Sequence, residues 1–400
     1  MDEKSTLTII SNYYLGGVFN FYRNILTNAP ANSFKKKIIF LTWKGYDYTL
    51  SNEGFKLCPE LFYEVGDNIR IYTKDIARLI GNEKGIVVTN FEAELSALHF
   101  YPKPEKIVIF VCHDEAYVRN AHKYEFLIDA FVAHNPFFYK LLQKDLPWRK
   151  EDIYYLPYGV EINELDKETN MNGPLNIVWL ARLVESKGIF EIPLVDDLLR
   201  EQNVVVNWTI IGSGPEKEKI ESILKNRSNF SFASPAGNIE LLELLEYQDV
   251  FVLPSRLDGL PVALLETMSR GIVPVMYKFN DGIDKIITND LGFISEVGDN
   301  RAFAENIIKL HEDRKLLKKM SERSRLKVVN DYDIKKQAIK YFDFFKNVKH
   351  STGKTKWKQL YAVHGREFHP YIPAILVRIF RRVRSLFKKN RINKSIVLFS

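Results

Sequence analysis

The sequence predicts an α/β protein with two doubly wound, Rossmann-like domains that face a cleft, followed by a basic C-terminal helical extension. Its 400 residues are too many for one ordinary domain and enough for two. Short apolar strand patterns alternate with helical patterns in two separate blocks, which is typical of parallel sheets covered by helices. Most of the positive charge lies in the last fifty residues, so this segment differs from both blocks.

The composition excludes several classes of protein. Hydrophobic residues make up 46% and charged residues 27%, a globular mixture unlike that of disordered or collagen-like chains. No apolar run approaches the ~20 residues of a membrane-spanning helix. The N-terminal MDEKSTLTII lacks the basic start and long apolar core of a secretory signal. Cys58 and Cys112 are too few for a disulfide framework or a four-thiolate metal site, so we expect a cytoplasmic protein.

The first block predicts a domain over residues 1–165. Its candidate strands are apolar at consecutive positions, as expected for a parallel sheet that is buried on both faces. These strands are 7–11, 37–42, 69–72, 86–89, 107–112 and 153–156. Candidate helices between them are 18–28, 74–80 and 136–144.

The second block follows the polar, turn-rich segment 166–174, which predicts a linker. Its candidate strands are 176–180, 207–211, 230–232, 250–254 and 272–276, and its candidate helices are 189–200, 215–225, 239–247 and 261–270. We expect a second domain over residues 174–332. Doubly wound domains bind ligands at the carboxyl ends of their strands, so two of them placed face to face create a ligand cleft.

The segment from Pro254 to Val275 shows the sharpest local pattern. A buried strand leads into a loop with Asp258 and Gly259, and Glu266 lies early in the helix that follows. Two carboxylates eight residues apart suit two hydroxyl-bearing parts of one ligand, because carboxylates only accept hydrogen bonds. The alternative is that Asp258 caps the helix and Glu266 is a solvated surface residue.

Two cations and two glycine pairs also follow predicted strands. Arg182 and Lys187 come after strand 176–180, where a diphosphate could be bound, although an ordinary solvated pair is the alternative. Gly212 and Gly214 follow the next strand, and Gly16-Gly17 follows the first one. Glycines there let the backbone approach an anion at a helix N-terminus, but tight turns explain such pairs more often.

The order and spacing of these motifs resemble the retaining glycosyltransferases of family 4, within glycosyltransferase group 1, which have the glycosyltransferase-B fold. The motifs are the glycine loop at Gly16-Gly17, His113-Asp114, LPYGV at 156–160, ARLVESKG at 181–188, IIGSGP at 210–215 and the run 243–275. The resemblance covers about residues 7 to 345. It implies that the helix over 333–349 crosses back to the N-terminal domain, on the acceptor side, and that the tail begins at 350.

The resemblance also implies roles for residues in the cleft. A nucleotide-sugar, linked to UDP or GDP, would be the donor substrate, and no cofactor or metal would be needed. Arg182 and Lys187 would stabilise the charge that grows on the diphosphate. Glu266 would bind the ribose, Asp258 the donor sugar, and His113 would contact the sugar from the opposite side. Further donor contacts would come from Gly16, Gly17, Gly212, Gly214, Gly259 and Leu260.

The chain departs from the family pattern at Asp258, where relatives usually have glutamate. The shorter side chain keeps the charge but reduces the reach toward the sugar. The segment 232–237 (FASPAG) replaces a common glycine turn, so base recognition is not predicted, and His134 has no assigned role.

The C-terminal segment predicts a basic amphipathic helix over residues 371–390. Residues 351–400 hold twelve lysines and arginines and one acid, which gives +11, whereas the first 350 residues hold 45 basic and 49 acidic residues, or −4. Helical geometry gathers seven apolar side chains on one face and six basic ones opposite. This pattern favours an anionic membrane surface, with packing on the protein body as the alternative, and the acidic body argues against nucleic acid.

Together these features predict a retaining, metal-independent glycosyltransferase, peripheral on the inner face of the cell membrane. It would transfer a sugar to a glycan or lipid-linked acceptor in cell-surface polysaccharide assembly. Two other classes stay open. One is a nucleotide-sugar epimerase or a polymerase of the same fold. The other is a catalytically silent partner subunit of another transferase.

Overall fold

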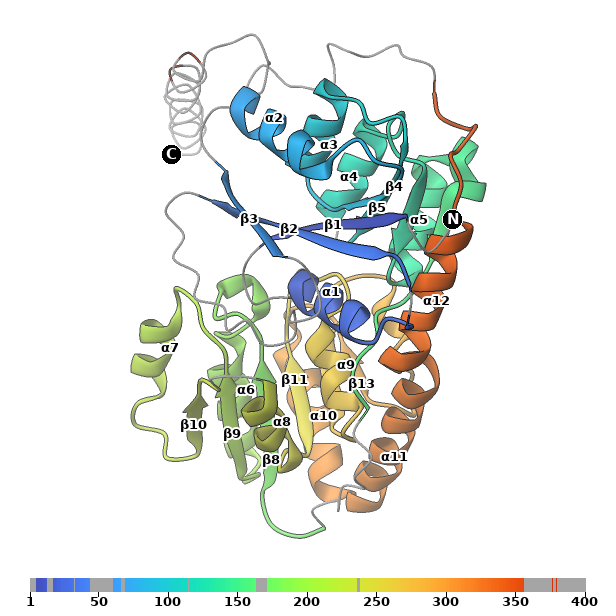
Figure 1. The fold of residues 1–400 in the computed structure, drawn as a ribbon. Helices are drawn as coiled ribbons and strands as arrows, with labels where there is room; N and C mark the ends of the chain where they lie inside the picture. Colours follow the sequence, from blue (N-terminus) through green and yellow to red (C-terminus); the bar gives the residue numbers. More distant parts are fainter. Residues whose placement is uncertain are drawn as a thin grey trace, which may run out of the picture.

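The computed structural model describes residues 5–12, 17–31, 33–43, 60–65, 69–113, 115–162, 171–235 and 238–355, with Leu376 and Ile379. Two parallel sheets, each flanked by helices, lie one above the other in Figure 1. Gly16 and Asp114 lie outside the described residues, as does nearly all of the predicted tail helix.

The upper sheet in Figure 1 has seven strands in the order β3-β2-β1-β4-β5-β6-β7. The central strands β4 and β5 are buried at every position, as expected for a sheet covered on both faces. Its strands are β1 (Thr6–Asn12), β2 (Lys35–Trp43), β3 (Glu60–Val65), β4 (Gly85–Thr89), β5 (Lys106–Cys112), β6 (Ala130–Ala133) and β7 (Ile153–Tyr155). Its helices are α1 (Gly17–Thr27), α2 (Ile69–Ile80), α3 (Glu92–Phe100), α4 (Glu115–Lys123) and α5 (Pro136–Asp145), with a 3-10 helix η1 (Pro147–Asp152).

The lower sheet has six strands in the order β10-β9-β8-β11-β12-β13. Its strands are β8 (Leu175–Leu180), β9 (Val206–Ile211), β10 (Phe230–Ala233), β11 (Val250–Leu253), β12 (Val273–Tyr277) and β13 (Phe293–Ser295). Its helices are α6 (Glu191–Glu201), α7 (Lys217–Leu224), α8 (Asn238–Glu246), α9 (Val262–Met268), α10 (Asn300–Glu312) and α11 (Arg314–Asp331), with 3-10 helices η2 (Glu185–Lys187) and η3 (Ile283–Lys285). Every predicted strand and helix of this block is present, with ends that differ by one or two residues.

The first sheet differs from the prediction at its edges. The predicted strand 69–72 is wrong, because these residues form the first turn of α2. Tyr72, Ile76 and Ile80 are spaced four residues apart and all are buried, so the apolar pattern is helical. The sequence analysis also missed β3 and β6. Strand β6 has only four residues, too few for an alternation pattern to be recognised.

In both sheets the strand order reverses beside the first strand of the domain, at β1/β4 and at β8/β11. Ligands bind in the crevices that such reversals leave at the carboxyl ends of the strands. The loops after β5, β8, β9, β11 and β12 all line one cleft between the two sheets. The topology therefore gathers residues from distant parts of the sequence at one place.

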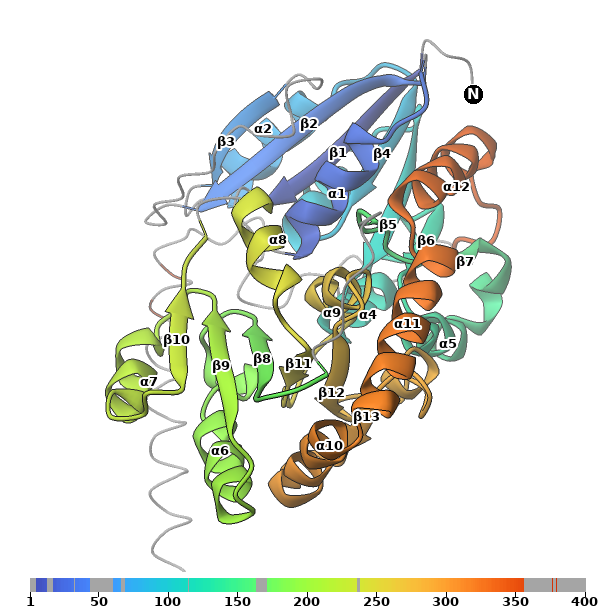
Figure 2. The same cartoon turned by 90° about the horizontal axis from the view of Figure 1, so that it is seen from below.

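Helices α11 and α12 (Ile334–Asn347) connect the two domains (Figure 2). Helix α11 packs on α9 of the second domain, and α12 packs on α1 of the first. Between them, the backbone N–H of Val160 donates to the carbonyl of Tyr332 at 2.8 Å. The hydroxyl of Tyr341 on α12 donates to the carbonyl of Leu156 at 2.6 Å.

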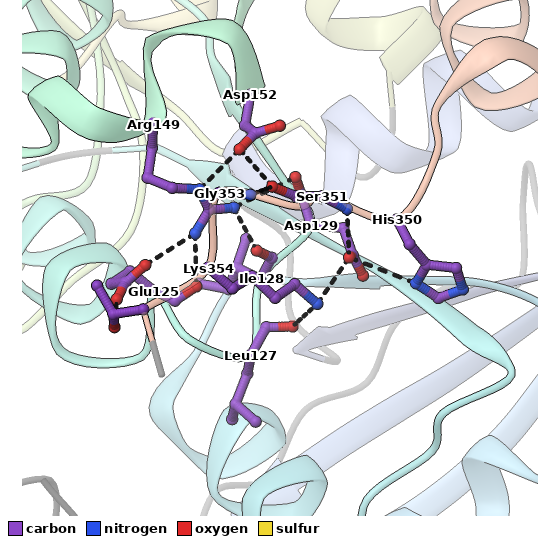
Figure 3. A network of polar contacts seen from close by, with 11 residues as sticks. Glu125, Leu127, Ile128, Asp129, Arg149, Asp152, His350, Ser351, Gly353 and Lys354 are labelled. Carbon is purple, nitrogen blue, oxygen red and sulfur yellow. Dashed lines mark hydrogen bonds and ion pairs between the residues drawn. The ribbon is translucent and has the colours of Figure 1, made fainter. Parts of the chain in front are cut away.

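After α12, residues 350–355 lie against the first domain (Figure 3). The side chain of Asp129 is 1% exposed, and its carboxylate pairs with Lys354 at 2.6 Å and accepts the Ser351 N–H at 3.0 Å. Arg149 is also buried and pairs with Glu125 at 2.9 Å and with Asp152 at 2.7 Å. The chain is therefore anchored to the first domain up to Thr355. In the described part of the chain, no helix combines the length and the apolar character needed to cross a bilayer.

Candidate active site

The cleft between the domains has a volume of about 1380 Å³ and collects most of the predicted site residues. Gly214 does not line it, and Gly16 lies outside the described residues. The predicted residues that line the cleft are Gly17, His113, Arg182, Lys187, Gly212, Asp258, Gly259, Leu260 and Glu266.

Two adjoining loops of the second domain hold Lys187 next to Asp258. Gly188 ends η2 with φ +74°, and a Cβ on it would lie 1.9 Å from the carbonyl oxygen of Pro254. The Arg256 N–H donates to the Ser186 carbonyl at 3.0 Å, which joins the two loops directly. Only glycine at 188 permits this approach, so the pattern K-G in the sequence has a structural cause.

Lys187 and Asp258 form an ion pair with each other, and their side chains are 16% and 15% exposed. The other Asp258 oxygen accepts the N–H of Gly259 at 2.9 Å. Asp258 does not cap α9, because the N-cap position is Pro261. Arg182, at the end of β8, is exposed in the cleft, and none of the described residues forms a hydrogen bond or ion pair with its side chain.

Glu266 lies on α9 in the wall of the cleft and is partly buried, so it is not a fully solvated surface residue. Burial raises the pKa of its carboxyl, while the positive charges of Arg23 and Arg270 act in the opposite direction. Within the described ranges its carboxylate accepts no hydrogen bond. A partly buried carboxylate without protein donors, in the wall of a cleft, is suited to accept hydrogen bonds from ligand hydroxyls.

The glycines after β9 have a packing role. Cβ atoms on Gly212 and Gly214 would lie 1.9 Å from the carbonyl oxygen of Ala181 and 2.3 Å from that of Leu183. The Leu183 N–H also donates to the Ser213 carbonyl at 2.8 Å. These glycines therefore let the β9–α7 loop support the loop that carries Arg182.

His113 is held by protein groups on both ring nitrogens. Its Nε2 lies 2.8 Å from Oδ1 of Asn90, and its Nδ1 lies 2.8 Å from the hydroxyl of Tyr158. Asn90 donates its amide to the Ile10 carbonyl at 2.7 Å, so its oxygen is the acceptor and His113 is protonated on Nε2. Burial and the neighbouring His134 keep the pKa of His113 well below its usual value, so the ring is neutral. In this arrangement neither nitrogen is free for a sugar.

The sequence analysis missed several residues of the cleft. Arg23 on α1 faces Glu266 from the first domain, and Asn280 and Lys278 follow β12. Lys278 and Asn280 could have been found, because they follow a predicted strand in the same way as Arg182. Arg23 gave no such signal, since its place depends on how the two domains meet.

The described ranges contain no group of three or more His, Cys, Asp or Glu side chains that could hold a metal ion. The functional groups gathered here are cations, carboxylates and backbone amides. Such a set can bind a ligand that combines phosphate with hydroxyl groups.

Comparisons with known proteins fit this site. Residues 161–327 match the family "Glycosyl transferases group 1". The putative colanic acid biosynthesis glycosyltransferase WcaL of Escherichia coli (strain K12) is 30% identical over 171 residues, 40% of this chain and 42% of the relative. The amylovoran biosynthesis glycosyltransferase AmsK of Erwinia amylovora is 27% identical over 184 residues, 44% of this chain and 45% of the relative. Thus the matched region spans less than half of either relative.

A solved structure extends the likeness to both domains. The crystal structure of Anabaena Alr3699/HepE in complex with UDP and glucose has a TM-score of 0.69 at 13% identity. The match covers 86% of this chain and 100% of the Anabaena chain. At this level of identity the likeness shows the fold. The chain has the glycosyltransferase-B fold, and its residues 161–327 are similar to the group 1 glycosyl transferases.

Proposed function

We propose that this chain is a retaining glycosyltransferase that uses a nucleoside-diphosphate sugar as donor. The observation that supports this most strongly is that Arg182, which has no side-chain partner among the described residues, lines one cleft with Lys187 and Glu266. The relatives with matching sequence are named as glycosyltransferases, and a neighbour of the same fold was crystallised with UDP and glucose.

In the proposed reaction, the bond between the sugar and the β-phosphate oxygen breaks while a bond to an acceptor hydroxyl forms on the same face. The proton of that hydroxyl passes to the departing phosphate oxygen, so the products are the glycosylated acceptor and the nucleoside diphosphate. Arg182 and Lys187 stabilise the negative charge that grows on the diphosphate. Glu266 accepts hydrogen bonds from the ribose, and Asp258 contacts the donor sugar after Lys187 has turned to the phosphate.

The two cations make a divalent metal unnecessary in this proposal. Arg182 offers a planar fork of donors to phosphate oxygens, and Lys187 adds a compact charge. Transfer should then continue when a chelator removes divalent ions.

We further propose that the acceptor is a glycan or lipid-linked glycan of a cell-surface polysaccharide, assembled at the inner face of the membrane. The names of the relatives refer to colanic acid and amylovoran biosynthesis. The tail contributes a second argument, because Leu376 and Ile379, from its predicted apolar face, are helical and 44% and 53% exposed. Side chains of this kind, opposite six cations, suit an anionic bilayer surface.

The experiment is a donor panel on the full chain, in which thermal shift is followed by detection of released nucleotide. UDP, GDP and their common sugars are tested with and without EDTA. A ligand at 100 times its dissociation constant stabilises a protein by ~2.7 kcal/mol, which is readily detected. The proposal predicts a shift with one nucleotide series that EDTA does not abolish. No shift with any nucleotide or nucleotide-sugar would count against it.

A further inference from the structure

Two glycines of the second domain touch the first domain so closely that no side chain fits. A Cβ on Gly259 would lie 2.2 Å from the carbonyl oxygen of His113. A Cβ on Gly282 would lie 2.6 Å from Cβ of Phe137, at the start of α5. Neither glycine has a left-handed φ. The backbone of the second domain would therefore tolerate alanine at both places, and the obstruction comes mainly from the other domain.

Asn280 joins these two contact points. Its amide nitrogen donates to the carbonyls of Asp258 and Gly259 at 3.1 and 3.2 Å. Its oxygen accepts the N–H of Gly282 at 2.8 Å and of Ile283 at 3.1 Å. One side chain thus fixes the β11–α9 loop (254–261) relative to the segment that carries Gly282.

In the first domain, across the contact with Gly259, His113 is also held in place. Asn90 and Tyr158 hold its ring from both nitrogens, and the ring is 8% exposed. Its carbonyl, which meets Gly259, therefore has a defined position. The backbone N–H of Gly259 donates in turn to the carboxylate of Asp258, which is the ion-pair partner of Lys187.

We propose that Gly259 and Gly282 form a seat, a contact surface without side chains on which the first domain closes. In this contact His113 is the positioning residue, because its carbonyl packs against Gly259 of the β11–α9 loop. His113 then acts through its carbonyl on Gly259, and through Gly259 on Asp258 and Lys187. The contact between domains stands without the proposed function. Only its consequence for sugar transfer rests on that function.

The test is hydrogen–deuterium exchange of the full chain carrying Gly259→Ala or Gly282→Ala. If the seat exists, each variant opens the contact. Amides at the end of β5 and the start of α5, in the first domain, should then exchange about tenfold faster than in the parent chain. The melting temperature should change little, because the added methyl group meets no obstruction from its own domain's backbone.

Gly17→Ala is the matched control at the same interface. Its Cβ would lie 3.7 Å from Cγ2 of Val262, an ordinary contact distance, so exchange in both domains should match the parent. Gly188→Ala is the opposite control, because its obstruction comes from Pro254 in its own domain. That variant should lower the melting temperature.

A double variant separates closure from damage to the loop. Phe137→Gly removes the Cβ that Gly282→Ala would meet, so in the double variant exchange at the end of β5 should return toward that of Phe137→Gly alone. Unchanged exchange in the first domain for both Gly259→Ala and Gly282→Ala would overturn the proposal. So would a loss confined to peptides of the second domain.

Once a donor is known, kinetics test the positioning role of His113. Tyr158→Phe removes the hydroxyl on Nδ1 and should lower kcat about tenfold or more while leaving nucleotide binding unchanged. A rise in the nucleotide dissociation constant with unchanged kcat would instead indicate that this part of the first domain contacts the nucleotide. If no donor is ever found, the exchange experiment still decides the question of the seat.

Discussion

Lys187 and Asp258 neutralise each other in the free cleft, although the resemblance assigns one to phosphate and the other to sugar. A diphosphate must therefore compete with a carboxylate for Lys187. Arg182 has no such competitor among the described residues and is the cation that is ready to bind. The sequence indicated that Arg182, Lys187 and Asp258 lie in the cleft, because each follows a strand. It could not indicate the pairing of Lys187 with Asp258, which are 71 residues apart and meet through the approach of two loops.

The pairing predicts an asymmetric effect of Asp258→Asn. The substitution keeps the size of the side chain but releases Lys187, so bare nucleoside diphosphate should bind several-fold more tightly. Transfer from the nucleotide-sugar should fall, because the proposed sugar contact loses its charge. Calorimetry with the nucleotide and a transfer assay measure the two effects. Weaker binding of the bare nucleotide would show that Asp258 does not restrain Lys187.

At the scale of elements, the end of β4 and the start of α3 form a buried polar junction. Glu94 accepts the N–H groups of Asn90 and Phe91 at 2.5 and 3.1 Å, and it is completely buried. Burial raises the pKa of Glu94 to about 8, so it is mostly protonated at neutral pH. His134 stacks on Tyr158, and burial lowers the pKa of His134 to about 3, so its ring is neutral at neutral pH.

These shifts predict how stability depends on pH. The folded-state pKa of Glu94 lies above its unfolded value of about 4.3, so its contribution to stability is lost as pH rises toward 8. His134 changes the free energy of unfolding with pH only below about pH 6.5. There its lowered folded-state pKa makes the protein less stable on acidification, the opposite direction to the effect of Glu94. Between pH 6.5 and 8 the free energy of unfolding should therefore fall by about 2 kcal/mol.

Glu94→Gln tests this assignment, because the amide keeps an acceptor for both N–H groups and cannot ionise. Denaturant unfolding at pH 6.5 and pH 8 should then give equal free energies for the variant, while the parent loses stability. An equal pH dependence in both proteins would assign the effect to another group.

The elements also show what sequence patterns can predict. Five of the six strands of the second sheet were predicted, because they are apolar runs bounded by turn residues, whereas the three-residue edge strand β13 was missed. The first sheet was harder at β3, β6 and α2, where short segments fit both periodicities and the choice depends on tertiary packing. The positions of Asn90 and Tyr158 around His113 likewise follow from the fold and not from any local motif.

At the scale of the whole molecule, residues 350–355 of the tail are held on the first domain, so the part of the tail without described contacts begins after Thr355. Residues 356–400 hold eleven lysines and arginines and one glutamate, a charge of +10. The described residues just before them, 350–355, lie on the first domain beside the buried Asp129. In the membrane proposal, attachment would thus hold the first domain near the bilayer.

Two truncations separate attachment from folding. Ending the chain after Thr355 should leave the melting temperature unchanged but abolish sedimentation with anionic vesicles, since each Lys or Arg near such a surface contributes ~1 kcal/mol. Ending it after Lys349 should lower the melting temperature, because Asp129 loses Lys354 and the Ser351 N–H.

Vesicle binding by the parent chain should weaken as salt screens the charges. Two results would refute the attachment: no binding of the parent chain at low salt, or undiminished binding of the chain that ends at Thr355.

The central claim is that the cleft binds a nucleoside diphosphate through Arg182. Calorimetric titration of UDP and GDP into the parent chain, Arg182→Ala and Arg256→Ala tests it most directly. Arg256 lies in the neighbouring loop, pairs with Glu191 and does not line the cleft, so its removal is the same change of charge at a matched place. We predict that one nucleotide binds the parent and Arg256→Ala alike and Arg182→Ala at least about tenfold more weakly. Equal weakening in both variants, or equal binding to all three proteins, would contradict the claim.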